Sequence, residues 1–184
     1  MILLRHGQSE FNVHIAATRL DPGIADPCLT EYGHIQAESA VRALAGQRIG
    51  RIVVSPYARA LQTAEPVARA LNVPVFVHPT VRERYGYACD IGTKRSVLRD
   101  RWPDHDFSGI EETWWPSDDE PADSVIARAA AFRTEMAARP DWSETLVVSH
   151  WGFILCMTGQ NVANGEWLRC DPTAAPPAEI VWRS

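Results

Sequence analysis

The sequence contains almost no lysine. Lys94 is the single lysine among 184 residues, and the other basic side chains apart from histidine are arginines. With 18 lysine and arginine residues against 23 acidic ones, the formal net charge is -5. Nucleic-acid binding requires clustered basic surface to meet the phosphates, so we expect no nucleic-acid partner. A small anionic ligand is still allowed, because a pocket needs only a few local cations.

Paired cysteines and metal-binding spacings are also missing. Cys28, Cys89, Cys156 and Cys170 form no CxxC pair, which excludes a zinc knuckle and a dithiol redox motif. The six histidines include no HExxH pattern. We therefore expect no metal and no other cofactor. A metal hydrolase site at the polar loop 104–106 is the alternative.

Long hydrophobic runs are absent as well. No stretch approaches the ~20 consecutive apolar residues of a membrane-spanning helix. The N-terminus lacks the charged and apolar regions of a secretory signal. We therefore expect a reduced, cytoplasmic protein that does not bind membranes. Its length predicts one domain over residues 1–184.

Short aliphatic runs alternate with helical patterns along the chain. Runs without polar alternation are typical of strands buried on both faces, and they occur at 2–4, 52–54, 73–77 and 146–148. Apolar spacings of three and four predict helices at 30–45, 56–71 and 122–138, with N-caps at Thr30, Ser55 and Asp123. Alternating strands and helices imply βαβ crossovers. We therefore predict an α/β fold, a three-layer helix-sheet-helix sandwich with a mainly parallel sheet.

The region from about 81 to 121 interrupts this pattern. It has no sustained period and contains six large aromatic residues, Tyr85, Tyr87, Trp102, Phe107, Trp114 and Trp115. Long irregular insertions are usually lids or binding loops, and so many aromatics argue against disorder. We expect a cap insertion over a site, anchored to the body by at least one of the adjacent tryptophans. Further along, we expect a turn at 164–165 and then two short edge strands interrupted by proline.

Polar residues follow three of the predicted strands directly. In open parallel sheets, ligands bind beyond the carboxyl ends of the strands, and here these junctions carry Arg5 with His6, Arg59, and His150. Each histidine alone could be structural, but two at equivalent strand ends favour a shared site. Arg59 falls in the first turn of a predicted helix, where the dipole disfavours a cation by ~0.3 to 1 kcal/mol. A bound anion would compensate, whereas the alternative is an arginine that bends into solvent.

Five ordered motifs resemble those of the histidine phosphatase superfamily, also called phosphoglycerate mutase-like. They are LRHGQSEFN, LTEYGHIQA, SPYARALQTA, VRERYG and VVSHWG, and the resemblance spans roughly residues 1–160. It implies that His6 is a nucleophile that takes a phosphoryl group, and that no metal is needed. It also implies phosphoryl contacts from the side chains of Arg5, Arg59, His150, Ser9 and Asn12. A neutral imidazole is a competent nucleophile, and the spreading phosphoryl charge is stabilised by positioned cations.

The general acid is assigned by motif position to Glu83, which would protonate the leaving oxygen and later deprotonate water. Its neighbours Arg82 and Arg84 complicate this role, because nearby cations favour the ionised carboxylate. Strand-like alternation could point both arginines away from it. Asp90 and Glu112 are alternative acids in the same insertion.

The resemblance implies a metal-independent phosphate monoester hydrolase with a small phosphorylated substrate. A phosphoglycerate-type mutase is the alternative enzyme, although such mutases tend to be longer and to keep a further insertion. A binding module that holds a phosphorylated ligand without hydrolysing it is the non-enzymatic alternative. Trp151 stands where the family more often has glycine. Its indole could form one wall of the pocket, but we expect it to pack against the sheet. The natural substrate and the oligomeric state cannot be predicted from the sequence.

Overall fold

The structure is a computed structural model that describes residues 1–182. Its strands are β1 (Ile2–Arg5), β2 (Arg51–Val54), β3 (Val75–Val77), β4 (Thr145–Ser149) and β5 (Trp167–Arg169). They form one sheet in the order β3-β2-β4-β1-β5. All neighbours pair in parallel except β1 and β5, which are antiparallel. The predicted α/β fold with a mainly parallel sheet is confirmed.

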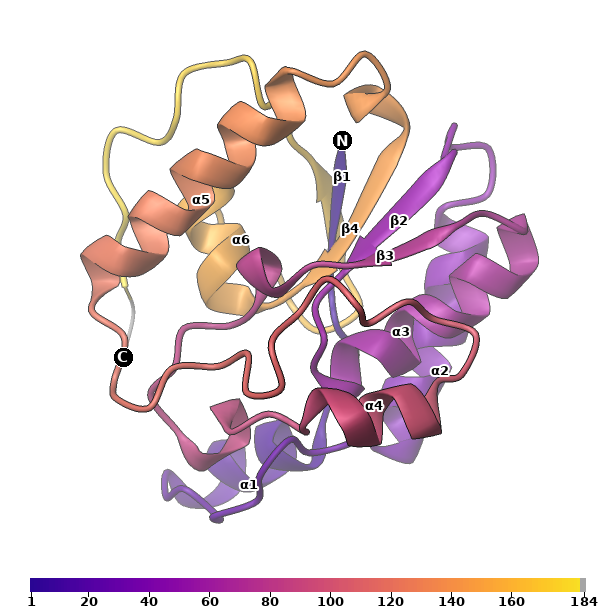
Figure 1. The fold of residues 1–184 in the computed structure, drawn as a ribbon. Coiled ribbons are helices and arrows are strands. Elements are labelled where there is room, and N and C mark those ends of the chain that lie inside the picture. The colour runs from indigo at the N-terminus through magenta and orange to yellow at the C-terminus, as the bar shows by residue number, and fades with distance from the viewer. Residues whose placement is uncertain (183–184) are drawn as a thin grey trace.

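Helices cover both faces of this sheet (Figure 1). The helices are α1 (Glu10–Thr18), α2 (Glu31–Ala43), α3 (Ala58–Leu71), α4 (Arg95–Arg101), α5 (Ala122–Ala137) and α6 (Trp151–Thr158). The helices α2 and α3 lie on one side of the strands, and α5 and α6 lie on the other. This is the predicted three-layer arrangement. Within residues 1–182, no helix has the length and apolar character that a membrane crossing requires.

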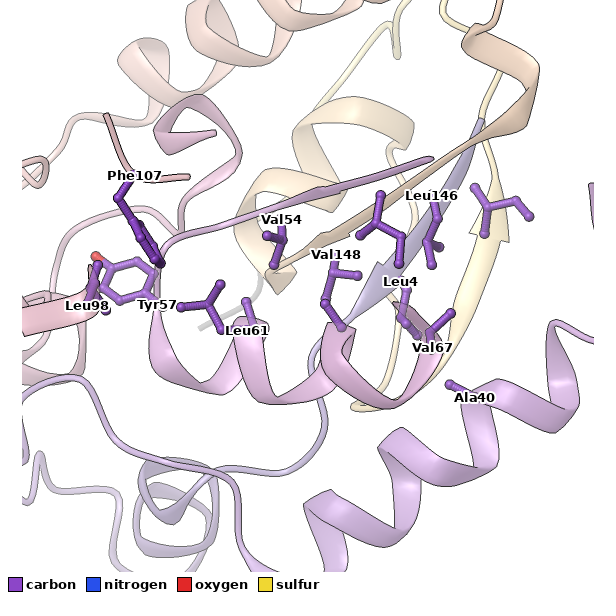
Figure 2. Packing of buried hydrophobic residues seen from close by; sticks show 14 of the residues in the cluster. Leu4, Ala40, Val54, Tyr57, Leu61, Val67, Leu98, Phe107, Leu146 and Val148 are labelled. Atoms are coloured by element: carbon purple, nitrogen blue, oxygen red, sulfur yellow. The ribbon is translucent and has the colours of Figure 1, made fainter. Parts of the chain in front are cut away.

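Neighbouring residues of each strand face opposite helical layers. Leu4 and Val54 pack with α2 and α3, whereas Leu3 and Val53 pack with α5 and α6. Figure 2 shows Leu61 of α3 between its helix and the strands. Because both sides of the strands are buried, the aliphatic runs show no polar alternation.

Of the three predicted N-caps, one is confirmed. Thr30 caps α2, since its hydroxyl accepts a hydrogen bond from the Gly33 N–H at 3.0 Å. Ser55 is wrong as a cap because α3 begins later, and its hydroxyl bonds instead to His150. Asp123 is also wrong, because α5 has already begun and Asp123 lies in its first turn. A carboxylate there still favours the helix through the dipole.

Three helices and one strand differ from the sequence prediction. The helix α1 buries none of its side chains, so it lacks an apolar stripe, and α4 has only seven residues. The helix α6 is buried on nearly all sides, which removes the 3.6-residue pattern. Of the two expected edge strands, only β5 forms in the described part of the chain. Prolines at 172, 176 and 177 follow it, and proline cannot donate to a ladder.

The insertion packs against the α2–α3 side of the core. Its buried residues Leu98 and Phe107 lie next to Tyr57 in Figure 2. Trp114 meets the Tyr57 ring edge-on at 4.7 Å and is 8% exposed. The expected tryptophan anchor is therefore confirmed. The segment 83–90 lies near α1, where the rings of Phe11 and Tyr87 are in contact.

Candidate active site

The carboxyl ends of β1, β4 and β2 bring the three polar junctions together. The His6 N–H bonds to the Ser149 carbonyl at 3.0 Å, and the Ser55 N–H bonds to the Val148 carbonyl at 3.1 Å. His6 follows β1 directly and His150 follows β4 directly. The parallel register therefore places both imidazoles at one edge of the sheet.

The imidazoles of His6 and His150 lie against one another. Their ring centroids are 5.0 Å apart and the ring planes are tilted by 57°. His6 is 3% exposed and His150 is fully buried. Two rings this close can meet the same phosphoryl group.

The backbone fixes the tautomer of His6. Its Nδ1 lies 2.7 Å from the Gly7 carbonyl, which can only accept a hydrogen bond, so Nδ1 carries the proton. The lone pair is then on Nε2. A side chain at Gly7 would come within 2.5 Å of the Gly33 carbonyl oxygen, so this close approach requires glycine. The Gly7 N–H also donates to the Thr63 hydroxyl at 3.1 Å.

Burial holds both imidazoles neutral. For His6, burial and then the guanidinium groups of Arg59 and Arg5 keep the pKa well below its usual value. For His150, burial and the same Arg59 lower the pKa well below that of a free imidazole. A neutral His6 keeps its Nε2 lone pair at pH 7.

His150 is held from two sides. Its Nε2 lies 2.8 Å from the Ser55 hydroxyl, and the Tyr57 ring meets it edge-on at 5.1 Å. Its Nδ1 is buried and has no hydrogen-bond partner within residues 1–182. One ring nitrogen is therefore buried behind His6 and, in the described part of the chain, unpaired.

Arg59 is buried, with 3% of its surface exposed, so the solvent-facing alternative is wrong. Its guanidinium donates to the Cys89 carbonyl at 2.8 Å and to Asp90 at 3.3 Å, and it stacks on the Tyr57 ring at 4.3 Å. Asp90 is thus the anion that compensates this cation near the start of α3. A planar guanidinium so fixed needs little reordering to bind a phosphate.

Arg5 lies in the same cavity. It donates to the Val162 carbonyl at 2.9 Å, while its Nε is buried without a partner among the described residues. An unsatisfied buried donor next to His6 favours an anionic ligand.

Glu83 is held at the N-terminus of α6. Its carboxylate accepts hydrogen bonds from the Gly152 N–H at 2.9 Å and from the Arg84 N–H at 2.8 Å. The guanidinium groups of its two neighbours turn to Glu120, with Arg82 at 3.0 Å from its carboxylate and Arg84 at 2.9 Å from its carbonyl. Both neighbouring guanidinium groups are therefore paired with Glu120, while the Glu83 carboxylate is held by backbone N–H groups.

The two alternative acids lie in different places. Asp90 lines the cavity and accepts hydrogen bonds from the N–H groups of Gly86 and Tyr87. Burial raises the pKa of Asp90 to about 6, although Arg59 opposes this. Glu112 bonds to Ser96 and does not line the cavity.

Ser9 and Asn12 lie at the start of α1. Ser9 is its N-cap, and its hydroxyl donates to the Asn12 Oδ1 at 3.0 Å. Asn164, which sequence reasoning missed, donates to the same oxygen at 3.1 Å. The amide Nδ2 of Asn12 is the group left to reach a ligand, whereas Ser9 orients Asn12.

One cavity of about 730 Å³ collects these residues. It is lined by Arg5, His6, Ser9, Phe11, Asn12, Ile15, Arg59, Glu83, Arg84, Tyr85, Gly86, Tyr87, Cys89, Asp90, Asp119, Trp151 and Trp182. His150 does not line the cavity, but its ring packs against the ring of His6, which does. Trp151 lines the wall, so the expected packing against the sheet is wrong and the alternative, a wall of the pocket, is confirmed. Trp182 carried no sequence signal, because no motif connects it to the site.

No arrangement of three or more histidine, cysteine, aspartate or glutamate side chains suited to a metal ion occurs among residues 1–182. The polar loop 104–106 therefore does not form a metal-binding cluster with its neighbours. The positive charge beside His6 comes from Arg5 and Arg59.

Comparison with known proteins assigns the family. The family model described as "Histidine phosphatase superfamily (branch 1)" matches residues 1–175. The chain belongs to this superfamily. The expected enzyme class, a phosphatase of the histidine phosphatase type, is confirmed at this level.

The relatives include both phosphatases and mutases. A glucosyl-3-phosphoglycerate phosphatase of Mycobacterium tuberculosis is 27% identical, with 100% of this chain and 91% of the relative covered. A probable phosphoglycerate mutase, GpmB, of Photorhabdus laumondii is 28% identical, with 85% of this chain and 72% of the relative covered. Among solved structures, a mycobacterial glucosyl-3-phosphoglycerate phosphatase complexed with VO3 has a TM-score of 0.63. The two sequences are 23% identical. The match covers 91% of this chain and 88% of the other chain, and it supports the fold.

Proposed function

We propose that this protein hydrolyses phosphate monoesters without a metal, through a phosphohistidine on His6. The observation that carries the proposal is the 2.7 Å contact between His6 Nδ1 and the Gly7 carbonyl. It leaves Nε2 as a free nucleophile in a buried site between two arginines. The residues proposed as catalytic are His6, Glu83 and His150.

The first step transfers the phosphoryl group to the protein. The lone pair on His6 Nε2 attacks phosphorus, the bond from phosphorus to the alcohol oxygen breaks, and protonated Glu83 gives its proton to that oxygen. Arg5 and Arg59 hold the phosphoryl oxygens, and the unpaired nitrogen of His150 contacts them.

The second step regenerates His6. Water gives a proton to the Glu83 carboxylate and attacks phosphorus, and the electrons of the phosphorus–nitrogen bond return to Nε2. Inorganic phosphate leaves and Glu83 is again protonated. Asn12 adds a hydrogen bond to the phosphoryl oxygens, and Ser9 keeps Asn12 in place.

Hydrolysis is better supported than a mutase reaction. Similarity to the phosphatase of Mycobacterium tuberculosis extends over 91% of that protein, but similarity to the probable mutase covers 72%. The binding-module alternative does not account for a fixed tautomer that frees a nucleophilic nitrogen. We further infer one domain over 1–184 with residues 81–121 as its cap, and a cytoplasmic location supported by four unpaired cysteines.

The decisive experiment is trapping of the phosphohistidine. Purified protein is mixed with a ³²P-labelled aryl phosphate in EDTA and quenched in alkali, which preserves phosphohistidine. We expect a burst of alcohol, acid-labile label on the protein, and release of inorganic phosphate. The variant His6→Asn keeps a donor toward the Gly7 carbonyl and should lose both label and turnover.

The matched control is His14→Asn, which alters an exposed histidine on α1 and should label normally. Transfer of label to an added glycerate hydroxyl without net phosphate release would favour the mutase. Binding without any label at any pH would favour the non-catalytic module.

A further inference from the structure

The cavity beside His6 is far larger than a phosphoryl group, and much of its wall is aromatic. Its volume of about 730 Å³ is within the range of small-molecule pockets, ~300 to 1,000 Å³. The cations that suit phosphate, Arg5 and Arg59, lie at His6. The remaining space must receive the alcohol part of a substrate.

One aromatic pair joins helix α6 to the C-terminal segment. Trp151 begins α6, and Trp182 lies in the C-terminal segment. Their ring centroids are 5.8 Å apart with an angle of 72°. The indole N–H of Trp151 is used by Asn161 at 2.8 Å. The carbon surface of its indole is therefore the part offered to a ligand.

A second aromatic pair comes from the first half of the chain. Phe11 of α1 and Tyr87 of the insertion have ring centroids 5.4 Å apart, with an angle of 51°. Tyr87 is 53% exposed although it lines the cavity. The exposed part of this ring is apolar surface on which a flat ligand could stack.

The charged side chains at this wall, Arg84 and Asp119, are of opposite sign. Arg84 stacks on the Trp182 ring at 4.9 Å and donates through its Nε to the Glu120 carbonyl, so its guanidinium is held against that ring. Asp119 lines the same cavity and would repel a second anionic group. Flat, uncharged chemistry fits such a wall better than a carboxylate or a second phosphate.

We infer that the alcohol part of the substrate carries a flat, uncharged aromatic or heteroaromatic ring that stacks on this wall. This inference rests on the proposed phosphatase function, and it differs from the glycerate groups in the names of the relatives. The phosphate binds at His6 and the ring lies between the aromatic pairs. An aromatic contact of this kind is worth about two- to tenfold in affinity beyond the area it buries.

The test compares phosphate esters of primary alcohols, so that the leaving group stays nearly constant. We expect kcat/KM to be highest for 2-phenylethyl phosphate, about threefold to tenfold above 2-cyclohexylethyl phosphate and about tenfold or more above propyl phosphate. Glucose 6-phosphate should be no better than propyl phosphate. The same order is expected for binding of the matching phosphonates, measured by calorimetry.

Variants connect the preference to the wall. In Trp151→Ala and Tyr87→Ala, the ratio of kcat/KM for the phenylethyl and propyl esters should fall toward one. Trp151→Phe keeps a ring and should keep most of the ratio. The matched control is Tyr32→Ala, which removes a tyrosine of similar exposure, 56%, outside the cavity and should leave the ratio unchanged.

The outcomes separate this inference from the proposed function. Equal kcat/KM for all esters, a cyclohexyl ester as good as the phenyl ester, or a preference for glucose 6-phosphate would overturn the aromatic substrate while leaving the phosphatase in place. If no ester is hydrolysed, the proposed function fails, and the phosphonate affinities still decide whether the wall selects a ring.

Discussion

The carboxylate of Glu83 accepts a hydrogen bond from the backbone N–H of Gly152 at 2.9 Å. A Cβ atom at Gly152 would lie 2.5 Å from that carboxylate oxygen, so Glu83 occupies the space that a side chain would need. The start of α6 thus fixes both His150 and the proposed acid. A single backbone segment couples the two.

We predict that Gly152→Ala displaces Glu83. Hydrolysis of propyl phosphate should fall about 10²-fold, because its alcohol needs a proton to leave, while hydrolysis of p-nitrophenyl phosphate should fall much less. The ratio of the two rates is the measurement. Gly109→Ala is the control, since a Cβ atom there meets nothing within 4 Å. Equal losses for both esters would argue against Glu83 as the acid.

The choice between Glu83 and Asp90 can be made from pH profiles. Burial raises the pKa of Asp90 to about 6, so an Asp90 acid would lose its proton, and kcat/KM would fall, above that pH. We expect Glu83→Gln to lower kcat for propyl phosphate by about 10²- to 10⁴-fold. Asp90→Asn should instead mainly raise KM, because it removes the carboxylate that holds Arg59. If kcat/KM of the wild type falls above about pH 6 and this fall is absent in Asp90→Asn, Asp90 rather than Glu83 is the general acid.

The two ends of the insertion are held by Arg128 of α5. Its guanidinium donates to the carbonyls of Thr80 and Arg82 and to both carboxylate oxygens of Glu120. We predict that Arg128→Met lowers the free energy of unfolding by about 2 to 3 kcal/mol, because the Thr80 and Arg82 carbonyls lose their donor and Glu120 loses one of its two cationic partners. Urea unfolding measures this.

The control for that variant is Arg69→Met, which breaks an exposed pair between Arg69 and Glu38. Exposed pairs contribute about 0 to 1 kcal/mol, so little change is expected. Similar losses in the two variants would mean that the Arg128 network does not hold the insertion.

The buried imidazoles should make the fold sensitive to acid. Burial lowers the pKa of both His6 and His150, so between those lowered values and 6.5 the unfolded chain binds more protons than the folded one. The free energy of unfolding should therefore decrease as the pH falls below about 6.5. Asp90 acts in the opposite sense, since its raised pKa adds stability as the pH falls through about 6.

Urea unfolding at pH 7.5 and 5.5 checks the sign. We expect the two imidazoles to outweigh Asp90, so the wild type should be less stable at pH 5.5. Asp90→Asn should show a steeper loss and His6→Asn a shallower one. A wild type that is more stable at pH 5.5 would contradict the prediction.

Sequence reasoning was strongest where several residues obey one physical rule. Buried strands gave continuous aliphatic runs, and the parallel sheet then placed His6 and His150 at one edge. It was weaker where one side chain has two possible partners. Ser55 has the chemistry of a helix cap, but its hydroxyl bonds to His150 across the sheet, a contact between residues 95 positions apart.

The walls of the cavity were the hardest part to predict. Trp151 and Tyr87 are aromatic residues in segments without a period, and only the fold decides whether such rings pack inward or line a pocket. The balance of charge was similarly hidden, because Arg82 and Arg84 are adjacent to Glu83 in sequence while their guanidinium groups reach Glu120. Sequence proximity alone did not reveal that partner.

Trp182 brings the end of the described chain to the cavity wall. A peptide fused downstream of Trp182 would be joined to the segment whose side chain lines the pocket. Substrate preferences measured on such a fusion would also reflect any effect of the added peptide on substrate binding at the cavity. A cleavable fusion compared before and after its removal would isolate the enzyme's own selectivity.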